Sequence, residues 1–321
     1  MSRAVPLSVT AALAAALLVA ARATAEEPEA PLEGLIFGEE VAVQMVLVPV
    51  VVEGRTGQPM PDLREEDFRL LVDGRPVPIE VFERGAQSPL SLIVLQDLSG
   101  SMAEPGKMEA SRNALDCLLD TARTHDEIAL ATFAGGQARV EVPFTGELAT
   151  LRESMAVWQA WGTTGLYDAV AWLPEITVGA ERTSRAAILV TDGVDNASAV
   201  PPGQAEQLVR QAKLPVYVLG LTAGRRRAPA DGTFRYDQLL EQLARQSGGR
   251  YYAVADPTAA RRACAALLTE LRLQYVLGFS VSGVGGARFH PLTVEVRPRR
   301  ARPTHRGGYH GTAPSAHQGN G

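Results

Sequence analysis

The spacing of apolar residues changes twice along the chain and divides it into three parts. In the central part, segments such as SLIVLQ (91–96) and AAILVT (186–191) are apolar almost throughout, which is typical of strands buried on both faces of a parallel sheet. Strands are expected at 90–96, 128–133, 139–142, 186–191, 216–221 and 250–254, and helices at 107–122, 148–156, 166–173, 204–211, 236–246 and 257–271. The last helix has Asp256 as its N-cap and Pro257 at its first position. This alternation predicts an α/β fold with a doubly wound, mostly parallel sheet.

Segments with strand character flank the central part on both sides. Residues 41–52 (VAVQMVLVPVVV) predict a long strand, in which Pro49 indicates an edge position or a bulge. Two short strands are predicted at 67–72 and 77–82 around Asp73-Gly74, a strong hairpin signal. Downstream, strands are expected at 274–281 and 292–297, with a glycine-rich turn between them. Because each set is too small to be stable alone, we expect residues 41–87 and 274–300 to pack together as one small β module beside an α/β domain over 88–273.

The two ends of the chain differ from the parts between them. Residues 1–25 combine Arg3, an apolar run and Ala23-Thr24-Ala25, which together are typical of a cleaved signal peptide. The alternative is an uncleaved membrane anchor, but the apolar run is shorter than the roughly 20 residues that span a bilayer. Residues 26–40 form an acidic leader, and residues 301–321 a basic tail that we expect to be disordered. The chain is therefore predicted to be exported, periplasmic or extracellular, without stable membrane insertion after cleavage.

Charge and cysteine usage narrow the range of functions. The chain has 31 basic and 36 acidic residues, a formal charge of −5, whereas a nucleic-acid-binding protein usually carries a basic patch. We therefore expect no nucleic-acid partner. Cys117 and Cys264 both fall in predicted helices. In an exported chain they could form a disulfide, and the alternative is a pair of buried free thiols.

The strongest chemical signal is the sequence Asp97-Leu98-Ser99-Gly100-Ser101, directly after the predicted strand at 90–96. In open α/β sheets, ligands bind beyond the carboxyl ends of the strands. Residues 97, 99 and 101 are spaced by two, so an extended turn directs one carboxylate and two hydroxyls to the same side. Hard oxygen donors of this kind suit Mg²⁺ and similar divalent ions rather than zinc or copper.

Two further segments could complete such a site. Asp192 follows the predicted strand at 186–191 and supplies a second carboxylate at a strand end. The segment Gly162-Thr163-Thr164-Gly165 supplies a hydroxyl beside the start of a predicted helix. On local pattern alone, these residues could also be solvated turns, in which Asp, Ser and Gly are common.

Together the three segments resemble the metal-ion-dependent adhesion site of von Willebrand factor A domains. DLSGS matches the D-x-S-x-S motif of that family, and TTGLYDA and VTDGVDN are similar to the segments that hold its threonine and second aspartate. The resemblance covers about residues 88–275. With VLVPVVV, LREEDFRLLVDG and LRLQYVLGFS it extends to exported bacterial von Willebrand factor A-related proteins and to nearly the whole mature chain. Gln96, in the strand beside Asp97, is an unusual polar choice.

The resemblance implies one metal ion, Mg²⁺ or alternatively Mn²⁺ or Ca²⁺. It implies that Ser99, Ser101 and Thr164 bind the ion through their hydroxyls, with Thr163 as the alternative to Thr164. It also implies that Asp97 and Asp192 bind directly or through water. One coordination position would stay open for an acidic side chain of an unidentified protein partner. The expected function is therefore metal-dependent protein binding in adhesion, assembly or scaffolding, without enzymatic activity.

Two other functions compete with this prediction. A phosphotransferase-type hydrolase could use Asp97, but that chemistry needs a second acid two residues later, where this chain has Ser99. A structural envelope protein with a vestigial metal site is the other alternative. Near the site, Asp195 could orient a bound water or be a solvated loop acid, and Asp168 is expected to stabilise its own helix start. Trp161 is expected to pack in the core or to line the ligand rim.

Overall fold

A computed structural model of the chain describes residues 43–85, 88–193, 195–211, 214–222, 233–282, 288–297 and 300–311. The predicted signal peptide, acidic leader and glycine-rich turn at 283–287 lie outside these ranges. The described residues belong to one compact unit. Within the described ranges, no helix combines the length and the apolar character needed to cross a bilayer.

A six-stranded sheet forms the centre of the α/β part, with strand order β10-β9-β8-β5-β6-β7. Its strands are β5 (Leu90–Asp97), β6 (Glu127–Ala134), β7 (Gln137–Thr145), β8 (Ser184–Thr191), β9 (Val216–Leu221) and β10 (Tyr251–Val254). All neighbouring pairs are parallel except β6 and β7, which form an antiparallel pair. The prediction of a mostly parallel sheet is confirmed.

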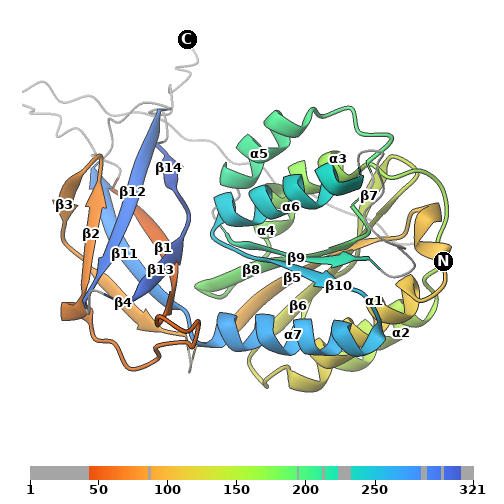
Figure 1. Cartoon of the computed structure of the whole chain (residues 1–321), viewed down its shortest axis with the longest axis horizontal. Coiled ribbons are helices and arrows are strands. Elements are labelled where there is room, and N and C mark those ends of the chain that lie inside the picture. Colours follow the sequence, from red (N-terminus) through yellow and green to blue (C-terminus); the bar gives the residue numbers. More distant parts are fainter. Residues whose placement is uncertain are drawn as a thin grey trace, which may run out of the picture. The chain divides into compact units, whose positions relative to one another are not determined.

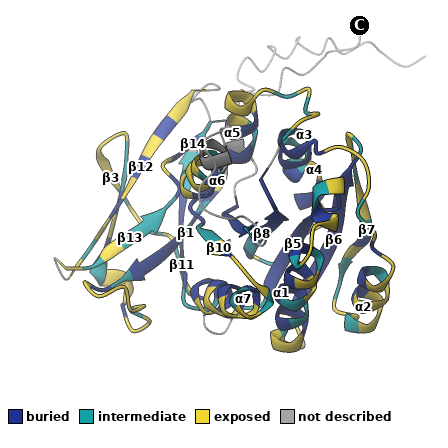
Figure 2. Cartoon of the chain, turned by 45° about the vertical axis from the view of Figure 1, so that its right-hand side comes forward, coloured by how far each residue is buried: buried dark blue, intermediate teal, exposed yellow. Residues whose placement is uncertain are grey.

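Helices cover both faces of this sheet (Figure 1). The helices are α1 (Lys107–Thr121), α2 (Leu148–Ala156), α3 (Leu166–Ala171), α4 (Leu173–Thr177), α5 (Pro202–Gln211), α6 (Thr233–Ser247) and α7 (Pro257–Arg272). Successive strand residues point to opposite faces: Leu92 and Val94 pack with α1, α2 and α7, whereas Ile93 and Leu95 pack with α3 to α6. β5, β6 and β9 are therefore buried along their whole length, whereas the edge strand β7 is largely exposed. The solvent-facing sides of the helices carry exposed residues (Figure 2).

The order of the strands determines where a ligand can bind. β5 lies between β8 and β6, so the chain winds outward from β5 first toward β6 and later toward β8. The carboxyl ends of β5 and β8 are therefore neighbours at the point where the strand order reverses, which is where open α/β sheets leave a crevice. Asp97 ends β5, and Asp192 directly follows β8.

The flanking segments pack together as two four-stranded sheets around a separate apolar core. The first sheet has the order β13-β1-β11-β4 and the second the order β14-β12-β2-β3. Their strands are β1 (Val43–Glu53), β2 (Phe68–Val72), β3 (Arg75–Val77), β4 (Val81–Arg84), β11 (Tyr275–Ser282), β12 (Phe289–Val296), β13 (Arg302–His305) and β14 (Gly308–His310). Each sheet combines strands from before and after the α/β part, so neither segment completes a sheet without the other.

The hairpin prediction is confirmed, with different limits for its second strand. Asp73 and Gly74 both have positive φ, 50° and 75°, as the tight turn between β2 and β3 requires. The returning strand begins at Arg75 and ends at Val77 rather than spanning 77–82. Val81–Arg84 instead joins the other sheet as β4, where it pairs with β11.

Pro49 lies at a local edge position, one of the two alternatives expected for it. β13 pairs with β1 only from Val50 onward, and the register of β1 with β11 runs through Pro49 without a bulge. Two further expectations are wrong. The single helix expected at 166–173 is two helices, because Pro174 near the start of α4 has no N–H to donate to the preceding turn. The tail expected to be disordered from residue 301 instead forms β13 and β14. Residues 312–321 lie outside the described ranges.

The two cysteines lie on facing helices, Cys117 on α1 and Cys264 on α7. Both are buried free thiols, so of the two alternatives the structure has the unbridged one. Burial, together with the neighbouring Cys117 thiol, raises the pKa of Cys264 above its usual range. A thiol held in its neutral form behaves as a small apolar side chain.

Candidate metal centre

The Asp97 carboxylate is held in place by one group from the loop after β5 and one from β8. Its Oδ1 accepts a hydrogen bond from the backbone N–H of Ser99 at 2.8 Å, and its Oδ2 accepts one from the Thr191 hydroxyl at 2.6 Å. Two residues further along the loop, the Ser99 and Ser101 hydroxyl oxygens lie 3.1 Å apart. One carboxylate and two hydroxyls are thus gathered at the end of β5, as the spacing of two predicted.

The loop that carries Thr164 is fixed between the loops after β5 and β8. The carbonyl of Gly162 accepts from Gly100 N at 2.9 Å, and Trp161 N donates to the carbonyl of Leu98 at 2.7 Å. On the other side, Thr164 N donates to Oδ1 of Asn196, whose own N–H donates to the Thr164 carbonyl. Gly162 has φ 68°, and a Cβ there would lie 2.9 Å from Gly135 Cα, so this approach requires glycine.

Burial separates the two threonines of this loop. Thr164 is 1% exposed, whereas the Thr163 side chain is exposed to solvent. Because Thr164 is the buried hydroxyl beside the Gly100 and Asn196 loops, it is the better placed of the two alternatives. Its role as a ligand stays a prediction.

Asp192 contacts a residue that the sequence did not single out. The Lys107 ammonium, at the start of α1, lies 2.7 Å from Oδ2 of Asp192 and 2.8 Å from Glu104. Lys107 is itself buried, at 4% exposed. In the sequence, Lys107 is marked only by its position six residues after Ser101, at the start of a predicted helix. That spacing does not show that the side chain turns back toward the strand ends.

Burial dominates the electrostatics of Asp97. The side chain is fully withdrawn from solvent, and this desolvation raises the pKa of Asp97 to about 6, against 3.8 for an ordinary aspartate. The hydrogen bonds from Thr191 and Ser99 favour the ionised form, and the negative charge of Asp192 opposes it. A carboxylate that is costly to ionise in isolation gains most from a cation placed beside it.

Three neighbouring polar residues have structural roles. Gln96 is fully buried and joins β5 to α1, since its amide donates to the Asp97 carbonyl and accepts from the Ser111 hydroxyl. Asp195 is not a free loop acid, because its Oδ1 accepts from Leu166 N at the start of α3 and from Ser198; a role in orienting a water stays a prediction. Asp168 lies in the first turn of α3, where its negative charge favours the helix start as expected. Its carboxylate accepts from the backbone N–H groups of residues 199 and 200 and so holds the loop before α5.

The donor set fits a hard divalent ion. In the described part of the chain, no group of three or more His, Cys, Asp and Glu side chains is placed to hold a metal. The site instead offers two carboxylates and neutral hydroxyls, which suits Mg²⁺ and does not suit zinc or copper. The structure gathers Asp97, Ser99, Ser101 and Asp192 at one edge of the sheet and ties the Thr164 backbone to the same loops. Binding of an ion by these five residues stays a prediction.

A comparison with known protein families gives a match over the residues that form the candidate site. Residues 92–194, which include all five site residues, match the family model of the von Willebrand factor type A domain. This match confirms the resemblance drawn from the three motifs. A search of curated proteins gave no significant match.

Several solved structures are similar to this chain. The conserved hypothetical protein BatB from Bacteroides thetaiotaomicron is 20% identical, with a TM-score of 0.47, over 57% of this chain and 98% of that chain. A von Willebrand factor type A protein from Catenulispora acidiphila is 15% identical, with a TM-score of 0.48, over 88% of this chain and 77% of that chain. The vWF domain of the type V pili tip protein Mfa5 from Porphyromonas gingivalis is 12% identical, with a TM-score of 0.46, over 58% of this chain and 96% of that chain.

Proposed function

Given that residues 92–194 match the von Willebrand factor type A domain, we propose that this chain is a non-enzymatic protein-binding module that acts outside the cytoplasm and holds its partner through one divalent metal ion. The observation that carries the proposal is the gathering of Asp97 and Asp192 with two hydroxyls 3.1 Å apart at the reversal point of the sheet. The partner is a protein that presents an acidic side chain.

Each residue of the site has a distinct part in this function. Ser99, Ser101 and Thr164 would bind the ion through their hydroxyl oxygens, and Asp97 and Asp192 would bind it directly or through water. The bound ion would supply a positive charge that neutral hydroxyls do not cancel, and so would attract a partner carboxylate. Lys107 keeps its ammonium beside Asp192 and Glu104 and so holds the Asp192 carboxylate at this edge of the sheet.

Trp161 gives the partner an apolar contact beside the ion. It is 55% exposed, although its backbone is fixed to Leu98 and its ring lies against Gly135. Of the two alternatives for Trp161, the rim of the site therefore fits better than the core. A rigid, exposed aromatic side chain next to a charged centre is typical of residues that dominate binding energy in protein interfaces.

Two measurements test the metal-dependent function. Calorimetric titration with Mg²⁺ should detect binding to one site in the wild-type protein and none in Asp97→Ala, while circular dichroism of the two proteins stays the same. Affinity capture from a cell-envelope extract should then retain a partner in Mg²⁺, and should lose it in chelator, in Asp97→Ala and in Trp161→Ala. Trp161→Ala should still bind Mg²⁺, which separates the contact surface from the metal site.

The opposite results would reject the proposal. Equal retention of the partner in Mg²⁺ and chelator would mean that the ion takes no part in binding. Phosphatase activity that disappears in Asp97→Ala would favour the hydrolase alternative instead. Export is tested separately by fractionating cells that produce the full chain. The proposal expects a mature protein beginning at Glu26 outside the cytoplasm.

A further inference from the structure

A buried guanidinium lies far from the metal centre, on the turn between β13 and β14. Arg306 is 5% exposed. Its Nη2 donates to the carbonyl of Leu47 at 2.8 Å, but its Nε and Nη1 have no hydrogen-bond partner among the described residues. Burial lowers the pKa of Arg306 to about 10, still well above neutral pH, so the group stays charged. A buried cation with unused donors is costly unless an anion reaches it.

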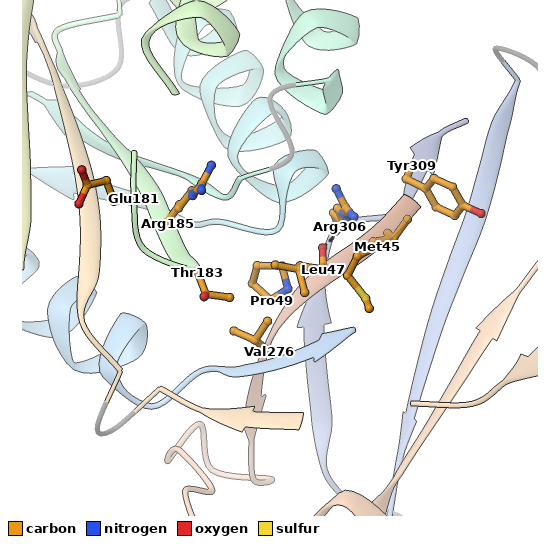
Figure 3. A pocket seen from close by; sticks show the side chains of 10 residues that line it. Met45, Leu47, Pro49, Glu181, Thr183, Arg185, Val276, Arg306 and Tyr309 are labelled. Carbon is orange, nitrogen blue, oxygen red and sulfur yellow. Dashed lines mark hydrogen bonds between the residues drawn. The ribbon is translucent and has the colours of Figure 1, made fainter. Parts of the chain in front are cut away.

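Arg306 lines a cavity of about 270 Å³ between the first β sheet and the start of β8 (Figure 3). One wall is apolar and is formed by Met45, Leu47 and Pro49 of β1, Val276 of β11, and Tyr309. The opposite wall carries Thr183 and Arg185. The cavity therefore combines a long apolar surface with a few polar groups, which is the usual composition of a small-molecule site.

The charge at the cavity is positive. Arg185 stands across the cavity from Arg306, whereas the Glu181 carboxylate is exposed and turned away from Arg306 (Figure 3). No described carboxylate therefore neutralises Arg306. A volume of about 270 Å³ lies at the lower end of the range for ligand sites, so the occupant is small.

We propose that this cavity binds a small carboxylic acid with an apolar body. The ligand carboxylate accepts hydrogen bonds from Arg306, and its apolar body lies against Leu47, Pro49 and Val276. The site is separate from the metal centre, because Arg185 lies at the start of β8 and Asp192 follows its end. A strand of eight residues places these ends roughly 25 Å apart. The inference thus stands independently of the proposed metal-dependent function.

The test uses octanoate as the probe and isothermal calorimetry on the full chain. Two ligands control for its two parts: 1-octanol has the same apolar chain without the carboxylate, and inorganic phosphate has the charge without the chain. We expect octanoate to bind at one site and to raise the melting temperature, and both controls to bind at least tenfold more weakly. This comparison uses only the wild-type protein, so it does not depend on whether a variant folds.

A pair of variants locates the site. Arg306→Met should fold, because it removes an incompletely paired buried charge and keeps an apolar stem, and it should weaken octanoate binding at least tenfold. Arg302→Met removes an exposed charge from the neighbouring strand β13 and should leave octanoate binding unchanged. Octanoate affinity that is equal in the wild type and Arg306→Met, or equal to that of octanol, would overturn the proposal. So would phosphate binding as tight as that of octanoate.

Discussion

The ammonium nitrogen of Lys107 lies 2.7 Å from Oδ2 of Asp192, and the two side chains are only 5% and 0% exposed. A cation of the protein itself therefore contacts one of the two carboxylates that the metal-binding proposal requires. In a buried pair, removal of one charge leaves the other uncompensated, and this costs far more than the pair contributes. Lys107 thus stabilises the metal-free protein, and under the metal-binding proposal it would compete with the ion for Asp192.

Lys107→Met is expected to make the fold depend on divalent metal. In chelator, the free energy of unfolding should fall by about 3–5 kcal/mol, because Asp192 loses its cation. In Mg²⁺ part of this loss should be recovered, so Mg²⁺ should stabilise the variant more than the wild type. Urea unfolding with and without Mg²⁺ measures both effects. Arg262→Met, which removes an exposed charge from α7, is the matched control, and an Mg²⁺ response equal to that of wild type in Lys107→Met would contradict the prediction.

Thr164→Val and Thr163→Val should have different effects on Mg²⁺ affinity. Valine keeps the shape of threonine and removes its hydroxyl. Loss of the buried Thr164 hydroxyl should weaken Mg²⁺ binding about tenfold or more, in the range known for groups around metal sites. Loss of the exposed Thr163 hydroxyl should have no effect. Calorimetric titration of both variants decides which threonine is the ligand, and equal affinities would remove Thr164 from the set.

Asp97 is expected to make the metal-free protein less stable as pH rises. Its native pKa of about 6 lies above the ordinary value of 3.8, so the folded state binds the proton more tightly than the unfolded state. The resulting stability is fully present below about pH 4 and is lost as pH rises through 6. The loss is about 3 kcal/mol at most.

Urea unfolding in chelator between pH 4 and 7 measures this dependence, and Asp97→Asn should lack it. Because a metal ion needs the ionised carboxylate, Mg²⁺ affinity should instead increase through the same range. Wild-type and Asp97→Asn stability curves that run parallel would show that Asp97 does not titrate in this range.

The stability that His305 contributes is expected to depend on pH in the opposite direction to that of Asp97. Burial lowers the pKa of His305 below 6.5, the ordinary value for a histidine. In the structure its Nε2 accepts from Val294 N at 3.2 Å, while Nδ1 lies 2.8 Å from the Arg306 carbonyl. The neutral ring can make both bonds, and protonation removes the acceptor. Stability from this group is therefore present above about pH 6.5 and is lost as pH falls.

His305→Gln should reduce the loss of stability between pH 7 and 5, because the glutamine side-chain oxygen accepts a hydrogen bond and does not titrate. Denaturant unfolding at each pH gives the comparison. His125 is exposed, and His125→Gln should keep the wild-type pH dependence. The prediction is wrong if the two variants behave alike.

The local sequence pattern was sufficient to predict most helices and strands of the α/β part. The limits expected for the helix at 148–156 and the strand at 216–221 coincide with α2 and β9, and Asp256 caps α7 through Ala259 N at 2.7 Å. These elements are determined by residues within a few positions of one another, so the sequence alone is informative. The two carboxylates and two serines of the candidate site were also found in this way, because each follows a recognisable apolar strand.

Other features depended on partners far away in the sequence. β13 and β14 are short and lack a run of apolar residues, and they become strands because β1 and β12 offer unpaired edges. Arg306 is buried because its guanidinium reaches Leu47, 259 residues earlier, and Lys107 meets Asp192 across 85 residues. The spacing of apolar and polar residues in the sequence determined which segments are helices and strands. It also determined which carboxylate and hydroxyl side chains follow the ends of the strands. Only the tertiary structure decided which charges are buried together, because burial and ion pairing depend on atoms that the chain brings close only when it folds.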